Sequence, residues 1–266
     1  EVTAFVGPRI ENYYMYITPS IYQPGVLKSM KLGGNSNFGA STDVGFGFKW
    51  ENDAGLGFAS NIVSKGADGT AGLIGADDVS KWDTQLAYTK ENWHASVTMS
   101  RGQNWTSQSY NATTLAAGMG DGTGNKSDEG SNDTVGYALR AYWRPDDAGS
   151  ATPEISVGYD TKSLVGDYGV TGTAKKADSY FVGFTWRDMF QADDRIGIAF
   201  TQPLKVTEVT GGGATNEVDP FVWEAYYSFR PNDSLEIRPA IFGGTDVLAD
   251  VNDDIFGAAV TTVFKF

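Results

Sequence analysis

The twelve residues 255–266 read IFGAAVTTVFKF. Its even-numbered positions are apolar except for one threonine: Phe256, Ala258, Val260, Thr262, Phe264 and Phe266. Successive side chains of a β-strand point to opposite faces, so this stretch predicts a strand with one apolar face along its whole length. The other face carries small residues and Lys265. Another layer of a soluble protein could cover the apolar face, and so could a lipid bilayer.

Composition narrows the choice of class. A chain of 266 residues fits one large all-β domain or two smaller ones. It contains no cysteine and a single histidine, His94, which excludes disulfides and argues against a histidine metal site. The net charge of −13 leaves no basic face for nucleic acid. The mean hydropathy of −0.29 does not argue against a membrane barrel, because only alternate residues of such a strand face lipid.

Alternation recurs in about a dozen runs, each of the length a tilted membrane strand needs. In residues 93–101, Trp93, Ala95, Val97 and Met99 alternate with polar side chains. Six of the seven tryptophans fall on the inferred apolar faces: Trp50, Trp82, Trp93, Trp143, Trp186 and Trp223. Several of them fall at strand ends, where an aromatic girdle belongs.

The connections between these runs alternate in length. Long connections are predicted at 7–42, 64–81, 102–132, 161–178, 202–219 and 243–253, and short ones at 51–55, 91–92, 144–152, 187–194 and 231–233. Outer-membrane barrels have short turns at one end and long loops at the other. We therefore predict an all-β fold, an antiparallel up-and-down transmembrane β-barrel with about 12 strands, in one domain spanning residues 1–266. The alternative is a soluble β-sandwich whose apolar faces form a buried core.

If the aromatic faces contact lipid, the opposite faces line the interior. The pattern predicts these pore-lining residues: Lys49, Asp83, Arg140, Arg187, Glu224, Arg230, Glu236 and Arg238. Such rings of charge bias which ions enter a pore. Arg140 and Arg238 could equally be wall residues paired with Glu224 or Glu236. The acidic residues of the long loops are either solvated or bind divalent cations at the level of lipopolysaccharide.

The segment 7–42 differs from the other long connections because it has enough apolar side chains to pack against something. We expect it to fold into the barrel and narrow the pore, with Arg9, Glu11, Tyr13 and Tyr14 as constriction candidates. Packing over the rim or in a subunit interface are the alternatives.

Catalysis has little support in the sequence. The only side chain suited to be a catalytic base, His94, lies next to the short turn at 91–92 without an evident nucleophile and acid partner. We expect no catalytic residue, no cofactor and no metal. A structural anchor or receptor barrel with a plugged lumen remains an alternative to a channel.

Four stretches resemble cyanobacterial outer-membrane porins of the branch related to carbohydrate-selective porins. They are FVGPRIENYYMYITPSIY at 5–22, VGFTWRDMFQADDRIGIAFTQP at 182–203, WEAYYSFRPNDSLEIRPAIF at 223–242 and TTVFKF at 261–266. The resemblance implies a passive outer-membrane channel for small hydrophilic solutes and ions that forms a homotrimer in the lipid bilayer beside lipopolysaccharide. It also implies that Phe266 is an assembly signal. Carbohydrate transport comes only from the family's name, because nothing in the lumen pattern indicates sugar selectivity.

The same resemblance implies a longer protein. Relatives have barrels of about 16 strands, so we expect about four first strands to be missing from this chain. They also carry an upstream domain that binds peptidoglycan, and we expect any peptidoglycan contact to be made through that missing part.

Overall fold

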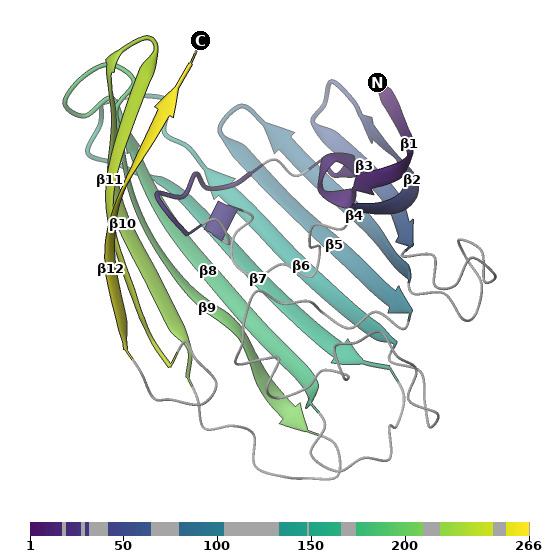
Figure 1. Ribbon diagram of the computed structural model, residues 1–266. Helices are drawn as coiled ribbons and strands as arrows, with labels where there is room; N and C mark the ends of the chain where they lie inside the picture. The colour runs from purple at the N-terminus through teal and green to yellow at the C-terminus, as the bar shows by residue number, and fades with distance from the viewer. Residues whose placement is uncertain are drawn as a thin grey trace.

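The computed structural model describes residues 1–17, 20–27, 30–31, 42–64, 80–103, 133–147, 149–165, 174–209, 219–246 and 254–265. These residues form twelve β-strands and one short 3-10 helix (Figure 1). The strands are β1 (Val2–Glu11), β2 (Thr42–Glu51), β3 (Leu56–Ser64), β4 (Ser80–Lys90), β5 (Trp93–Gln103), β6 (Thr134–Trp143), β7 (Glu154–Leu164), β8 (Ala174–Arg187), β9 (Arg195–Val209), β10 (Phe221–Asn232), β11 (Leu235–Thr245) and β12 (Ile255–Phe264); the helix is η1 (Asn12–Met15). No helix among the described residues has the length and apolar character needed to cross a membrane.

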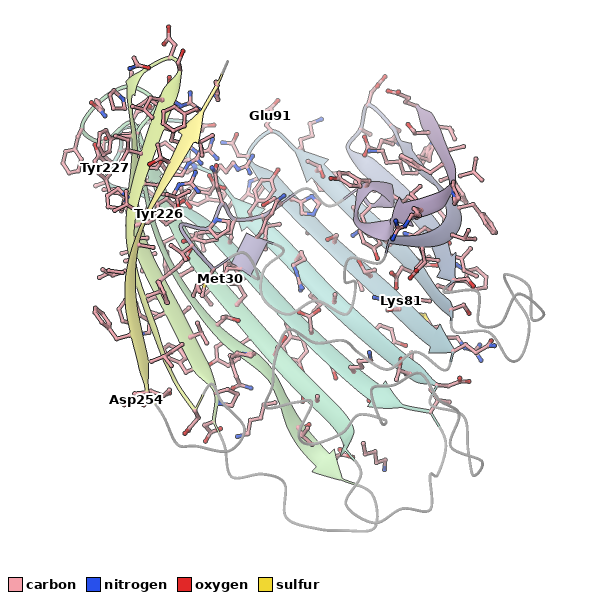
Figure 2. All side chains as sticks on the ribbon, viewed as in Figure 1. Met30, Lys81, Glu91, Tyr226, Tyr227 and Asp254 are labelled. Carbon is pink, nitrogen blue, oxygen red and sulfur yellow. The ribbon has the colours of Figure 1, made fainter. Side chains whose placement is uncertain are left out.

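All twelve strands belong to one antiparallel sheet in which each strand pairs with its neighbours in sequence, from β1 to β12. The up-and-down order is confirmed, and the described residues form one sheet rather than the two packed sheets of a sandwich. Glu91, in the turn between β4 and β5, and Asp254, before β12, mark the two opposite ends of the strands (Figure 2). We call these the short-turn end and the long-loop end.

The sheet curves into an open trough (Figure 1). In the part of the chain that the structure describes, β1 pairs only with β2 and β12 only with β11. The barrel is therefore not closed by these residues.

The sheet has two different faces, because successive side chains of each strand point to opposite sides. On the outer face, large apolar side chains are exposed and meet across strands, as in the pairs Leu86↔Val97 and Val97↔Leu139. The exposed set includes Phe48, Trp82, Leu86, Trp93, Met99, Leu139, Val157, Tyr180, Ile241, Phe256 and Val260. The inner face carries the polar side chains that alternate with them. Tyr226 and Tyr227, neighbours on β10, point to opposite faces of the sheet (Figure 2).

Several predicted boundaries are wrong. The long connection starts after Glu11 rather than at Gly7, because β1 continues past Pro8 through a register shift between Gly7 and Ile10. Proline lacks the N–H of a ladder bond, but an edge strand or a bulge tolerates it. Likewise β8 begins at Ala174 and β9 runs to Val209, so the predicted loops 161–178 and 202–219 are too long.

Candidate channel interior

The predicted pore-lining residues all lie on the inner face, but they differ in exposure. Asp83, Arg140 and Glu224 are buried, with relative exposures of 0%, 2% and 0%. Glu236 and Arg238 are mostly buried, whereas the side chains of Arg187 and Arg230 are 45% and 36% exposed. Lys49 lies on the inner face of β2, opposite Ala59. A role for these residues in conduction remains a prediction.

Residues 14–17 and 20–27, which we call the inner segment, lie against the inner face of the sheet (Figure 1). Of the constriction candidates, Arg9 and Glu11 belong to β1 rather than to a loop, and Arg9 is exposed. Tyr14 is 63% exposed. The side chains of Glu11 and Tyr13, and all of Phe266, lie outside the described residues.

At its C-terminal part the inner segment is held by Glu224 on β10. The Glu224 carboxylate accepts hydrogen bonds from the backbone N–H groups of Gly25, Val26 and Leu27 at 2.8, 3.1 and 2.9 Å. Gly25 is needed for this approach, because a Cβ at that position would lie 2.8 Å from the Cβ of Tyr226. Three donors on one buried carboxylate give strong, charge-assisted bonds.

The neighbouring wall residues bind carbonyl oxygens of the same stretch. The Tyr226 hydroxyl donates to the oxygen of Gln23 at 2.5 Å, and Arg238 Nη1 donates to the oxygen of Pro24 at 2.8 Å. From β7, Ser156 Oγ donates to the oxygen of Ile21 at 2.5 Å. The wall therefore satisfies both donors and acceptors of a backbone that has no secondary structure there.

At its other end the inner segment contacts β4. The Tyr16 hydroxyl donates to Asp83, and the N–H of Ile17 donates to Gln85 Oε1 at 2.8 Å. Burial raises the pKa of Tyr16 well above its ordinary value, and the Asp83 carboxylate raises it further. Tyr16 therefore stays protonated and keeps its donor.

Buried ion pairs lie on the inner face of β4, β6 and β7. Arg140 Nη2 binds Asp160 Oδ2 at 2.7 Å with both side chains fully buried, and Lys81 Nζ lies 3.7 Å from Asp83 Oδ2. Arg140 is thus a wall residue, but its partner is Asp160 rather than Glu224 or Glu236. Arg238, in contrast, does pair with Glu236.

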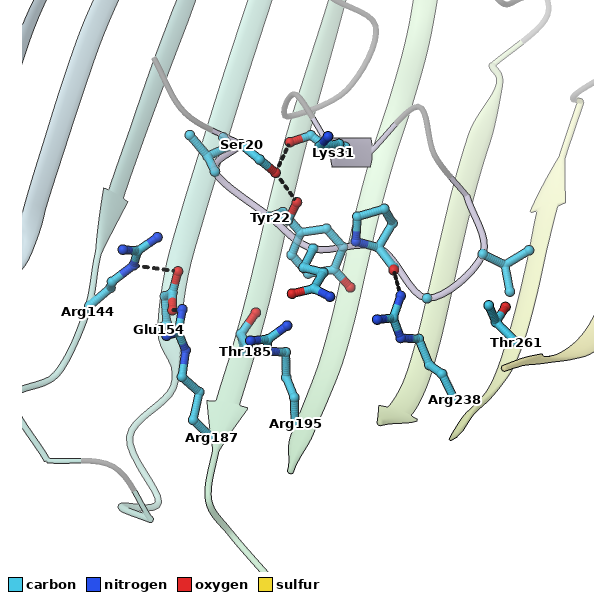
Figure 3. Close-up of a pocket in the computed structure, with 15 residues that line it drawn as sticks. Ser20, Tyr22, Lys31, Arg144, Glu154, Thr185, Arg187, Arg195, Arg238 and Thr261 are labelled. Carbon is cyan, nitrogen blue, oxygen red and sulfur yellow. Dashed lines mark hydrogen bonds and ion pairs between the residues drawn. The ribbon is translucent and has the colours of Figure 1, made fainter. Parts of the chain in front are cut away.

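A cavity of about 520 Å³ lies between the inner segment and the short-turn ends of the strands (Figure 3). Charged side chains on its wall are Lys31, Arg144, Glu154, Arg187, Arg195 and Arg238. Glu154 binds two of them, with Arg144 Nε at 2.9 Å and Arg187 Nη2 at 2.8 Å. The guanidinium of Arg144 also lies over the ring of Tyr142 at 3.9 Å from its centroid.

Four of these residues were not predicted: Lys31, Arg144, Glu154 and Arg195. Arg144 opens the predicted turn 144–152. Glu154 and Arg195 precede the apolar positions Ile155 and Ile196, so alternation gives both an inner position. Arg195 could have been found by counting back by twos from Ala199, because both occupy inner positions of β9.

The single histidine belongs to the wall. His94 Nδ1 is 2.7 Å from Thr89 Oγ1, Nε2 is 3.2 Å from Ser96 Oγ, and the ring stacks on Tyr142. The described residues contain no cluster of three or more histidine, cysteine, aspartate or glutamate side chains that could hold a metal ion.

Comparisons with known proteins find similar chains among solved structures. No protein-family profile and no curated protein sequence matches the chain. Among solved structures, the chain is similar to Salmonella typhi OmpF, determined in complex with daunomycin. The TM-score is 0.56 at 12% sequence identity, over 86% of this chain and 63% of the OmpF chain. The chain thus spans less than two thirds of that structure's length, and what the likeness shows is a porin-like β-barrel fold.

Proposed function

We propose that the protein is an outer-membrane porin, a passive diffusion channel for small hydrophilic solutes and inorganic ions. One observation carries this proposal: apolar and aromatic side chains are exposed on the outer face, while charged side chains gather on the inner one. A soluble protein has the opposite arrangement, whereas a barrel in lipid with a wet interior needs this one.

The inner segment supports a channel of restricted width. It crosses the inner face from β4 to β10 and leaves the arginine-lined cavity on its short-turn side. Solutes that pass it meet a polar wall of both charge signs, so the proposal is a size-limited pore rather than a wide one.

We further propose that the complete barrel has about 16 strands, as is common for porins of this kind. The outer edges of β1 and β12, which pair with no other strand in the described part of the chain, support this, because backbone N–H and C=O groups in lipid must be paired. The missing strands would be supplied by residues outside 1–266. Membership of the cyanobacterial branch, a homotrimer, contact with lipopolysaccharide and a peptidoglycan-binding domain upstream belong to the same proposal and rest on the motifs at 5–22, 182–203, 223–242 and 261–266.

A second candidate is a structural anchor or receptor barrel with a plugged lumen. It is favoured by the number of bonds that fix the inner segment, which is held from β4, β7, β10 and β11. A plug needs such fixation, but so does a rigid constriction.

Planar-bilayer recording separates the two. The complete protein, extracted from outer membranes, is expected to give stepwise, ohmic conductance in KCl, with steps grouped in threes if the homotrimer is correct. Insertion into the bilayer without any conductance would contradict the channel and favour the anchor. Gel electrophoresis of boiled and unboiled samples gives the oligomeric state independently.

A further inference from the structure

The cavity on the short-turn side of the inner segment has two adjacent arginines on its wall. Arg187 on β8 and Arg195 on β9 are direct partners in the antiparallel register, so their side chains start side by side on the inner face (Figure 3). Like charges directly opposite each other destabilise a sheet unless something of the opposite charge lies between or beside them.

The carboxylates of the wall do not supply enough opposite charge. Glu154 is shared by Arg144 and Arg187, and Glu236 is bound by Arg238 and lies 3.8 Å from Arg230 Nε. Glu224 is engaged with three backbone N–H groups.

Arg195 is the arginine of this wall that has no carboxylate partner among the described residues. Among the residues that the structure describes, no carboxylate oxygen lies within ion-pair distance of its guanidinium. Its Nε is buried and has no hydrogen-bond partner. A buried donor without a partner costs free energy, and a charged one costs more.

The cavity has the size and chemistry to provide that partner. Its volume of about 520 Å³ is within the range of pockets for small molecules and well above the size of one phosphate group. Thr185 and Ser20 add hydroxyl groups to the lining. Arg144, stacked on Tyr142, and Arg238, bonded to Pro24, are held in place before any solute arrives.

We propose that this cavity is a binding site for oxyanions, the phosphate or carboxylate groups of small solutes, with the guanidinium of Arg195 at its centre. Planar, fork-shaped guanidinium groups bind phosphate and carboxylate oxygens in pairs, which chloride does not offer. This inference rests on the proposed channel, because the solute must reach the interior. It adds a site at which oxyanions pause while chloride passes.

The test measures block of chloride current. Single channels of the complete protein are recorded in KCl while inorganic phosphate, or in a second series glucose 6-phosphate, is added. Both should lower the chloride current in a saturable way, and the more effective of the two distinguishes free phosphate from an organic phosphate as the preferred solute.

Arg195→Gln should raise the half-blocking concentration by about tenfold or more, the effect of losing one charge-assisted contact. Arg195→Lys keeps the charge but not the fork and should give an intermediate value. Arg101→Gln, which removes an exposed arginine from the outer face of β5, should leave the block unchanged. Heat-modifiable gel migration verifies that each variant folds. If Arg195→Gln does not fold, the comparison is made with Arg195→Lys.

The outcomes separate the two proposals. Chloride conductance without block by either phosphate compound overturns the oxyanion site and leaves the channel standing, as does equal block in the Arg195 variants and the Arg101 control. If the protein conducts nothing, the channel is wrong, and titration calorimetry of the solubilised protein with inorganic phosphate decides the site: heat of binding that is lost in Arg195→Gln supports it, and no binding overturns it.

Discussion

Glu224 and Gly25 are 199 positions apart in the sequence, yet the N–H of Gly25 donates to the carboxylate of Glu224 at 2.8 Å. The bond ties the inner segment to β10, and two further N–H groups join it.

Glu224→Gln should loosen the inner segment. An amide keeps one acceptor oxygen but loses the charge, so at least one of the three N–H groups loses its partner, at a cost of about 1–3 kcal/mol. We expect the folded band to disappear at a lower temperature when samples are heated stepwise before electrophoresis. We also expect the single-channel current to become noisier. Glu208→Gln is the control, because Glu208 is half-exposed in a pair with Lys175 at 3.8 Å. An exposed pair of this kind is worth at most about 1 kcal/mol, so equal effects of the two changes would contradict the anchor.

The Arg140–Asp160 pair should matter for stability rather than for ion selectivity. Arg140→Met removes the arginine from the fully buried Asp160 carboxylate, which keeps the hydrogen bond from Ser179 Oγ, and should lower the free energy of unfolding by about 3–5 kcal/mol. The double change Arg140→Met with Asp160→Leu should recover most of that loss, because both charges then leave the wall. Urea titration of the folded band measures both. If the single variant is as stable as the parent and shifts the reversal potential, Arg140 faces the solute instead.

Asp194 should give the β8–β9 turn a dependence on acid pH. Its carboxylate accepts hydrogen bonds from the N–H groups of Met189, Phe190 and Gln191 and from the Tyr227 hydroxyl. Burial by itself raises the pKa of Asp194, but these donors outweigh it, and the pKa is lowered.

A lowered pKa in the folded state stabilises the protein above the unfolded pKa of about 3.9, and this stabilisation is lost as the pH falls through the folded value. The melting temperature of the parent should therefore drop more steeply below about pH 4 than that of Asp194→Asn. Asp254→Asn, at an exposed position before β12, should follow the parent. Parallel curves for the parent and Asp194→Asn would show that this turn does not contribute.

Glu154 should moderate the positive charge of the cavity. Glu154→Gln removes the one carboxylate that the described residues place on the cavity lining and frees Arg144 and Arg187. We expect the reversal potential in a KCl gradient to shift toward anions, with the chloride-to-potassium permeability ratio rising by roughly a factor of a few. An unchanged reversal potential would place Glu154 away from the ion path.

The sequence predicts the fold better than the interior. A period of two fixes which face each residue of a strand occupies, so Leu86, Trp93 and Phe256 could be assigned to the outer face and Asp83 and Glu224 to the inner one. Alternation in loop length was enough to predict the order of the strands. It did not predict where β1 ends, because the tolerance of an edge strand for Pro8 depends on its having one neighbour.

The pairings of the interior were harder to predict because they depend on register and on the path of the inner segment. Asp160 meets Arg140 across two adjacent strands at a diagonal, which needs the residue-level register of β6 and β7. To predict the contact of Glu224 with Gly25, one must know where the irregular inner segment lies, and the alternation of side chains does not indicate that. Arg195 was missed although its alternation with Ile196 places it on the inner face, because it lies directly after the predicted turn 187–194.

The inner segment also has a mechanical consequence. It is bonded to β4 at one end and to β10 and β11 at the other, and so it connects walls that are far apart around the sheet. A strut of this kind resists both flattening and widening of the trough. Lateral pressure from the surrounding lipids should therefore change the cross-section of the pore little, and bilayers of different tension should yield the same unitary conductance.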